Sequence, residues 1–176
     1  MIARKDISPF FSSFLLGAGC KIFFMLIATA FIIFKAMSDG SGVESLSVEG
    51  LKKAYPNGIA NYSFGKYLSA LIVAPLIENL QFPLALWMKN KTGIKVYFLG
   101  IVIGAVAFFA HYFVGGGMAA GITGAVLFLF MAAQYFLSLE RENPKRSYWL
   151  TVATHCGFNA ASFSIIHFLD AVILYA

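Results

Sequence analysis

Long apolar runs, separated by short polar connectors, dominate this chain. Each run is close to the roughly 20 residues that an α-helix needs to cross the hydrocarbon core of a bilayer. A span must be a helix or part of a closed barrel, because lipid offers no partner for a free backbone group. The runs are far longer than the roughly 10-residue strands of a barrel. The pattern therefore predicts an all-α fold, a polytopic transmembrane helical bundle with about five spans. These spans are expected at residues 10–34, 65–88, 96–113, 118–139 and 148–174.

The segment between the first two runs differs from the rest of the chain. Residues 38–64 are rich in Ser, Gly and acidic side chains, and they contain the turn signal Pro56-Asn57-Gly58. We therefore expect two parts. Residues 1–64 form an N-terminal anchor helix and a polar extracytoplasmic loop, and residues 65–176 form a helical core.

Composition and charge support a membrane protein and argue against a nucleic-acid partner. The chain is 60% hydrophobic and 12% charged, whereas soluble domains are about 45–50% apolar and about 25% charged. The net charge is +5, but the basic residues gather before the first run and in the connectors 89–95 and 140–147. Alternating spans place these three groups on one side, which is then cytoplasmic. We expect an integral protein of a bacterial plasma membrane, surrounded by lipid, with a cytoplasmic N-terminus and an external C-terminus.

Four polar residues lie inside the apolar runs, where an ionisable group costs about 2.5–3.5 kcal/mol on insertion scales. Glu78 is in the middle of the second run and His111 is near the end of the third. His155 and Asn159 are four residues apart in the fifth run, so they share one helix face. A single intramembrane histidine is more often a satisfied interhelical hydrogen bond than a catalyst. Together, the four can supply a base, a proton carrier and hydrogen-bond donors, or a metal site.

Two further polar residues are predicted to lie apart from this set. Lys21 lies inside the first run, and it should face other helices or extend toward the interface. His167 follows His155 by twelve residues, which rotates it about 120° around the helix. It also lies close to the end of its span, so we expect it at the interface.

The four residues lie in short motifs that resemble those of the CPBP intramembrane proteases. This family includes the CAAX prenyl endopeptidases and the bacteriocin-processing and immunity proteins, and it has the motifs EExxxR, FxxxH and HxxxN on successive helices. The corresponding segments here are ENLQFP at 78–83, AFFAH at 107–111 and HCGFN at 155–159. The third motif is complete, and the resemblance covers about residues 65–165.

The first two motifs depart from the family pattern. Asn79 and Pro83 replace the second Glu and the Arg, and Ala107 replaces the Phe. Losing one member of a buried ion pair costs about 3–5 kcal/mol, because the remaining charge is left without a partner. Replacing both the Glu and the Arg of the motif with neutral residues avoids this cost. Pro83 has no N–H to donate to the carbonyl of Asn79. We therefore expect a kink beside Glu78 and a free carbonyl at Asn79.

The resemblance implies an intramembrane peptidase that acts on a peptide or a membrane protein. Glu78 would activate water, while His111, His155 and Asn159 would position it and stabilise the oxyanion. An apolar cavity makes a carboxylate a stronger base than it is in water, which suits that role. A divalent metal such as zinc, held by Glu78, His111 and His155, is the alternative, although the chain has no HExxH signature. Straight spans place His111 nearer the outer end than Glu78 and His155. Tilt, a kink at Pro83 or a different span boundary near the glycines at 115–117 would bring it to them.

Two other functions fit the same residues. The departures at Asn79 and Pro83 are compatible with a non-catalytic membrane scaffold or a bacteriocin-immunity-type protein that keeps the fold. An intramembrane Glu with two His residues could also relay protons through a small transporter or channel. The lack of an internal repeat in the sequence argues against a transporter built from repeats.

Overall fold

The structure is a computed structural model that describes residues 4–38, 64–115 and 117–175. These ranges contain helices and short turns and no strand, which confirms the predicted all-α class. The polar loop predicted over 38–64 lies almost wholly outside the described residues. The predicted division of the chain at residue 64 therefore stays a prediction.

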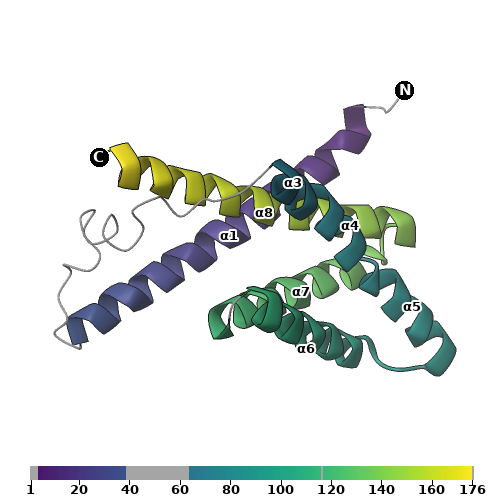
Figure 1. Cartoon of the computed structure of the whole chain (residues 1–176). Coiled ribbons are helices and arrows are strands. Elements are labelled where there is room, and N and C mark those ends of the chain that lie inside the picture. The colour runs from purple at the N-terminus through teal and green to yellow at the C-terminus, as the bar shows by residue number, and fades with distance from the viewer. Residues whose placement is uncertain (1–3, 39–63, 116, 176) are drawn as a thin grey trace.

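The described helices follow the predicted apolar runs (Figure 1). Four of the runs each form one continuous helix, and the run at 65–88 is divided into four shorter elements. The continuous helices are α1 (Arg4–Ser38), α6 (Val96–Gly115), α7 (Met118–Ser138) and α8 (Pro144–Tyr175). The shorter elements are α3 (Phe64–Leu68), the π-helical segment η2 (Ser69–Val73), α4 (Ala74–Glu78) and α5 (Gln81–Thr92).

Among the described residues, four helical stretches are long and apolar enough to cross a membrane. These are Ser8–Ile27, Phe64–Thr92, Val96–Val114 and Met118–Ser138. They coincide with four of the five predicted spans. The fifth predicted span lies in α8, which is 32 residues long but carries Thr, Ser, His and Asn side chains along its length. By length and composition, the chain is a helical bundle suited to a membrane.

Two glycines form the tight connections that place α6 between α5 and α7. Gly93 ends α5 with φ 72°, and Gly117 precedes α7 with φ 115°. Residues with a Cβ rarely adopt positive φ, whereas glycine does so readily. The connection at Gly117 is short, so α6 and α7 run antiparallel and pack side by side (Figure 1).

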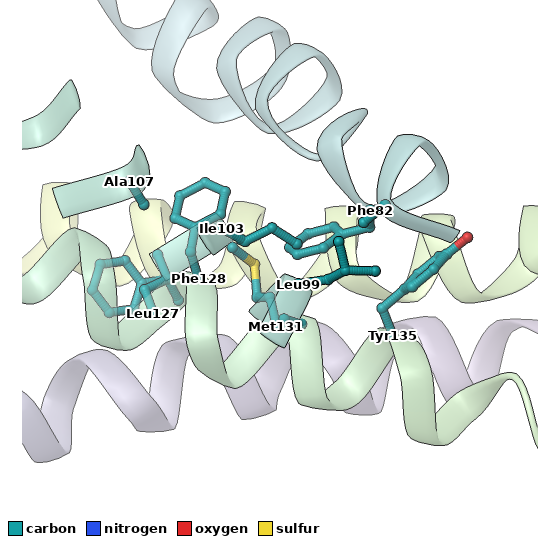
Figure 2. Close-up of a cluster of buried hydrophobic side chains, with 11 residues drawn as sticks. Phe82, Leu99, Ile103, Ala107, Leu127, Phe128, Met131 and Tyr135 are labelled. Carbon is teal, nitrogen blue, oxygen red and sulfur yellow. The ribbon is translucent and has the colours of Figure 1, made fainter. Parts of the chain in front are cut away.

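A cluster of aromatic and aliphatic side chains lies where α5, α6 and α7 meet (Figure 2). Phe82 stacks on Phe128 and on Tyr135, with ring centroids 6.2 Å and 5.7 Å apart. Met131 fills the space beside them and is fully buried. Helices in lipid associate largely through such close packing, because lipid tails are as apolar as the side chains. This cluster therefore holds Phe128 in a fixed position.

The two longest helices, α1 and α8, cross with their backbones in contact (Figure 1). A Cβ atom built at Gly17 would lie 1.8 Å from the carbonyl oxygen of Thr154. One built at Gly157 would lie 1.9 Å from the carbonyl oxygen of Phe14. Only glycine permits this approach. The crossing also brings Lys21, one turn beyond Gly17, toward α8.

Candidate active site

The helix that carries Glu78 is interrupted directly after this residue, as predicted. Helix α4 ends at Glu78 and α5 begins at Gln81. The predicted free carbonyl at Asn79 is wrong, because the N–H of Phe82 donates to it at 3.1 Å. This bond spans three residues, whereas an α-helical bond from Phe82 would span four and reach the carbonyl of Glu78. That carbonyl instead accepts a hydrogen bond from Nε2 of Gln81 at 2.9 Å. The backbone at the break is thus satisfied locally.

Glu78 and His155 face each other across the break. Oε2 of Glu78 lies 3.8 Å from Nε2 of His155, which is too far for a hydrogen bond. The His155 side chain is 3% exposed and that of Glu78 is 39% exposed. Oε2 itself is enclosed, and it has no hydrogen-bond partner among the residues that the structure describes. A buried acceptor without a partner is costly and is typical of a reactive or ligand-binding position.

The other nitrogen of His155 contacts Asn79, the residue that departs from the family motif. Nδ1 lies 3.4 Å from Oδ1 of Asn79, and Asn79 is fully buried. With the amide in this orientation, its oxygen only accepts, which favours a proton on Nδ1 of the neutral ring. Nε2 then presents a lone pair toward Glu78. Two acceptors facing each other can both accept hydrogens from one water molecule.

His111 reaches the same region from α6. Its Nδ1 donates to the carbonyl of Ala107 at 2.9 Å, which leaves Nε2 unused by that bond. The ring packs against Gly124 of α7, where an added Cβ would lie only 2.6 Å from the His111 Cγ. The Phe128 ring contacts both imidazoles, with its centroid 5.9 Å from that of His111 and 5.3 Å from that of His155.

Two cavities, each of about 480 Å³, meet at His111. The first is lined by Glu78, Gln81 and His111 among apolar side chains. The second is lined by His111, His155, Asn159 and Lys21. His111 therefore lines one cavity together with Glu78. The helix is interrupted directly after Glu78, at the place where a kink was expected.

Asn159 lines the second cavity, but its amide also has a structural partner. Its Nδ2 donates to the carbonyl of Ala70 at 2.7 Å. In η2 the N–H of Ala74 bonds to the carbonyl of Ser69, five residues back. The next donor in that register would be Pro75, which has no N–H. Asn159 therefore satisfies a backbone carbonyl that the π-helical turn leaves free.

The divalent-metal alternative at Glu78, His111 and His155 stays a prediction. In the described part of the chain, no group of three or more His, Cys, Asp or Glu side chains is close enough to hold a metal ion.

His167 lies apart from the site, in agreement with its predicted separation from His155. It is exposed, and its ring stacks on Tyr67 with centroids 5.4 Å apart. The Tyr67 hydroxyl and Nε2 of His167 also share a hydrogen bond.

Three residues of the site were not assigned to it from the sequence. Lys21 was singled out only as a costly intramembrane charge, and Asn79 only as a departure from a motif. Gly124 carried no polar signal, although Gly121 and Gly124 are three residues apart in one apolar run and so share a helix face. Folding brings each of these three residues to a candidate site residue or to a cavity that such a residue lines, and the sequence alone does not show this.

Comparison with known proteins adds no family to this description. The chain matches none of the protein-family models, curated proteins or solved structures with which it was compared.

Proposed function

We propose that this chain is an intramembrane peptidase of the CPBP type, in which Glu78 activates water. The supporting observation is the enclosed Oε2 of Glu78, which has no hydrogen-bond partner in the described part of the chain and lies 3.8 Å from Nε2 of His155. A water molecule between these atoms donates one hydrogen to each. Both groups then increase the electron density on its oxygen.

The proposed reaction is hydrolysis of one peptide bond. Oε2 of Glu78 takes a proton from water while the water oxygen attacks the carbonyl carbon of the substrate. The developing oxyanion accepts a hydrogen bond from Nε2–H of His111 in its imidazolium form, in which Nδ1–H keeps its bond to the carbonyl of Ala107. The C–N bond then breaks, and the leaving amine takes the proton from Glu78. The apolar walls of the Glu78 cavity suit a membrane-embedded peptide segment.

We also propose that the protein lies in a bacterial plasma membrane with its N-terminus in the cytoplasm. The last turn of α5 and the connector that follows it carry exposed lysines at positions 89, 91 and 95, and basic segments at span ends favour the cytoplasmic side. Charge-reversing substitutions at these lysines should disturb topology, as measured by the accessibility of single cysteines placed in the connector.

The test of the peptidase proposal is the substitution Glu78→Gln. We expect new peptide N-termini in membranes of cells that express the wild-type chain, measured by mass spectrometry. Removing the base should lower their yield by about 10²–10⁴-fold. Glu140→Gln is the matched control, because this exposed carboxylate lies in a connector, and its yield should equal that of the wild type. Unchanged cleavage with Glu78→Gln contradicts the proposal.

A non-catalytic membrane scaffold is the second candidate, and the bond between Asn159 and Ala70 favours it. In this candidate the motif residues join helices instead of holding a substrate. Alanine substitutions at Glu78, His111 and His155 would then leave partner binding unchanged, and wild-type membranes would contain no new N-termini.

A further inference from the structure

Lys21 lies inside a membrane-spanning stretch of α1, and its amine is turned toward the bundle. The stretch runs from Ser8 to Ile27. The Lys21 Nζ lies 5.0 Å from the ring centroid of Phe158 on α8, and Phe158 is buried. An ammonium over an aromatic face is attracted by the ring quadrupole. This contact holds the amine between the helices and away from the lipid.

The cavity beside Lys21 offers donors and no acidic partner. Lys21, Thr123, His111 and His155 line it, and no Asp or Glu does. No ion pair of Lys21 occurs among the described residues. A charge at bilayer depth normally has a compensating charge or faces a water-filled cavity. A lone ammonium beside a hydroxyl is a suitable receptor for an anion.

We propose that this cavity binds the carboxylate of a membrane-embedded ligand. The cavity holds one full positive charge, which matches a monoanion. A phosphate group carries nearly two negative charges near neutral pH and is usually bound by several cations or by Arg. The carboxylate of Glu78 lines the neighbouring cavity, so it does not occupy this position.

The location of the cavity indicates how a bound carboxylate would contribute to substrate selection. This part of the proposal rests on the proposed peptidase function. His111 borders both cavities. A peptide segment whose bond lies beside Glu78 would therefore reach Lys21 with a carboxylate placed a few residues away. The site would then select acidic substrate segments and exclude neutral ones.

Binding can be measured without any cleavage. We would use the full chain carrying Glu78→Gln in detergent micelles, with ¹⁵N-labelled histidines observed by NMR. The probes are N-dodecanoyl-glycyl-glycine, its C-terminal amide, dodecanoate and dodecyl phosphate. Since Glu78→Gln removes the proposed base, a failure of binding is distinct from a failure of the peptidase proposal.

We expect both carboxylate probes to shift the His111 and His155 ring signals saturably. His167 is the internal reference, because it bonds to Tyr67 outside this cavity, and its signal should stay constant. The amide probe should leave all three signals unchanged. Tighter binding of the acyl dipeptide than of dodecanoate would identify a peptide as the source of the carboxylate, and the reverse order would identify a fatty acid.

Substitution of Lys21 should remove the site. Lys21→Met should weaken binding of the dipeptide carboxylate at least about tenfold, as expected for loss of a charged hydrogen bond, and Lys21→Arg should retain it. Lys91→Met, which removes an exposed lysine in the last turn of α5, should bind like the parent. Lys21→Gln provides a second neutral variant if Lys21→Met loses the His167 signal of the folded protein. Equal binding by the neutral variants, binding of the amide probe, or tighter binding of dodecyl phosphate would overturn the proposal.

Discussion

At the crossing of α1 and α8 the two backbones touch, whereas beside Glu78 the helices leave two cavities between them. The crossing contains glycines and backbone atoms with no space for a methyl group. The region around Glu78 contains an interrupted helix and an enclosed carboxylate oxygen without a partner. Both regions share α8. Thr154 and Gly157 face α1, while His155 faces Glu78.

This difference indicates how a small helical bundle can keep a polar cavity open in lipid. The hydrophobic effect does not drive one apolar helix onto another in a bilayer, so stability comes from close packing and interhelical hydrogen bonds. The glycine crossing supplies such packing one or two residues away from His155. A rigid helix can then hold an imidazole opposite a carboxylate that it does not directly bond.

The largest effect is expected at the crossing. Gly17→Leu and Gly157→Leu each place a side chain where even a Cβ would lie within 2 Å of a carbonyl oxygen. The helices must separate, and we expect a loss of at least about 3 kcal/mol in unfolding free energy. The measurement is unfolding in mixed micelles, followed by helicity.

Gly19 provides the matched control for this prediction. An added Cβ at Gly19 meets nothing within 4 Å, so Gly19→Leu should be neutral or should stabilise α1 by up to about 1 kcal/mol. If all three variants unfold at the same denaturant concentration, the close crossing does not contribute to stability.

Gly124→Ala should have a smaller effect on stability. It tests the region of the two cavities beside Glu78 and His111. The new methyl group would lie 2.6 Å from Cγ of His111, and the imidazole would have to move. Because a side chain can shift more easily than a backbone, stability should change little. On the proposed function, a misplaced catalytic group lowers the cleavage rate by about 10–100-fold.

The His111 ring signal gives a readout of Gly124→Ala that does not depend on cleavage, and it should move while His155 moves less. Gly100→Ala on α6 is the control, because an added Cβ there has no neighbour within 4 Å. An unmoved His111 signal in the Gly124 variant would show that the ring does not rest on this glycine.

The sequence was sufficient to find the helices, four of which are long and apolar enough to cross a membrane, and to single out the polar residues within them, because both depend on the energetics of lipid. Long apolar runs predicted the helices, and Glu78, His111 and His155 were visible as costly polar residues in these runs. Gly124 could not be found this way, since its contribution is a missing side chain. Lys21 could be singled out as a costly charge inside an apolar run, but its neighbours are determined by the crossing of α1 and α8.

The local conformation near Asn159 was harder to predict for a different reason. The motif placed Asn159 beside a reacting water, whereas its amide bonds to the carbonyl of Ala70. That partner exists because Ser69–Val73 adopts a π-helical register just before Pro75. A register change of one residue depends on how the segment packs, and apolar periodicity over five residues cannot reveal it.

The smallest effect is expected for Asn159→Ala, which tests the region to which this residue belongs. Loss of its bond leaves the carbonyl of Ala70 without that donor, and interhelical bonds in membrane proteins contribute about 0.6–1.7 kcal/mol. Asn90→Ala, at an exposed site in α5, should change stability less than this.

A double-mutant cycle with Pro75→Ala makes this prediction specific. Alanine at position 75 restores an N–H that can bond to the Ala70 carbonyl, so Asn159→Ala should then have a smaller effect. We expect the four unfolding free energies to deviate from additivity by at least about 0.5 kcal/mol. Additive values would mean that the bond to Ala70 is not what Asn159 contributes, and Asn159 would belong with the reactive groups around Glu78. Non-additive free energies would assign Asn159 to the packed part of the bundle. The candidate reactive residues would then be Glu78, His111 and His155.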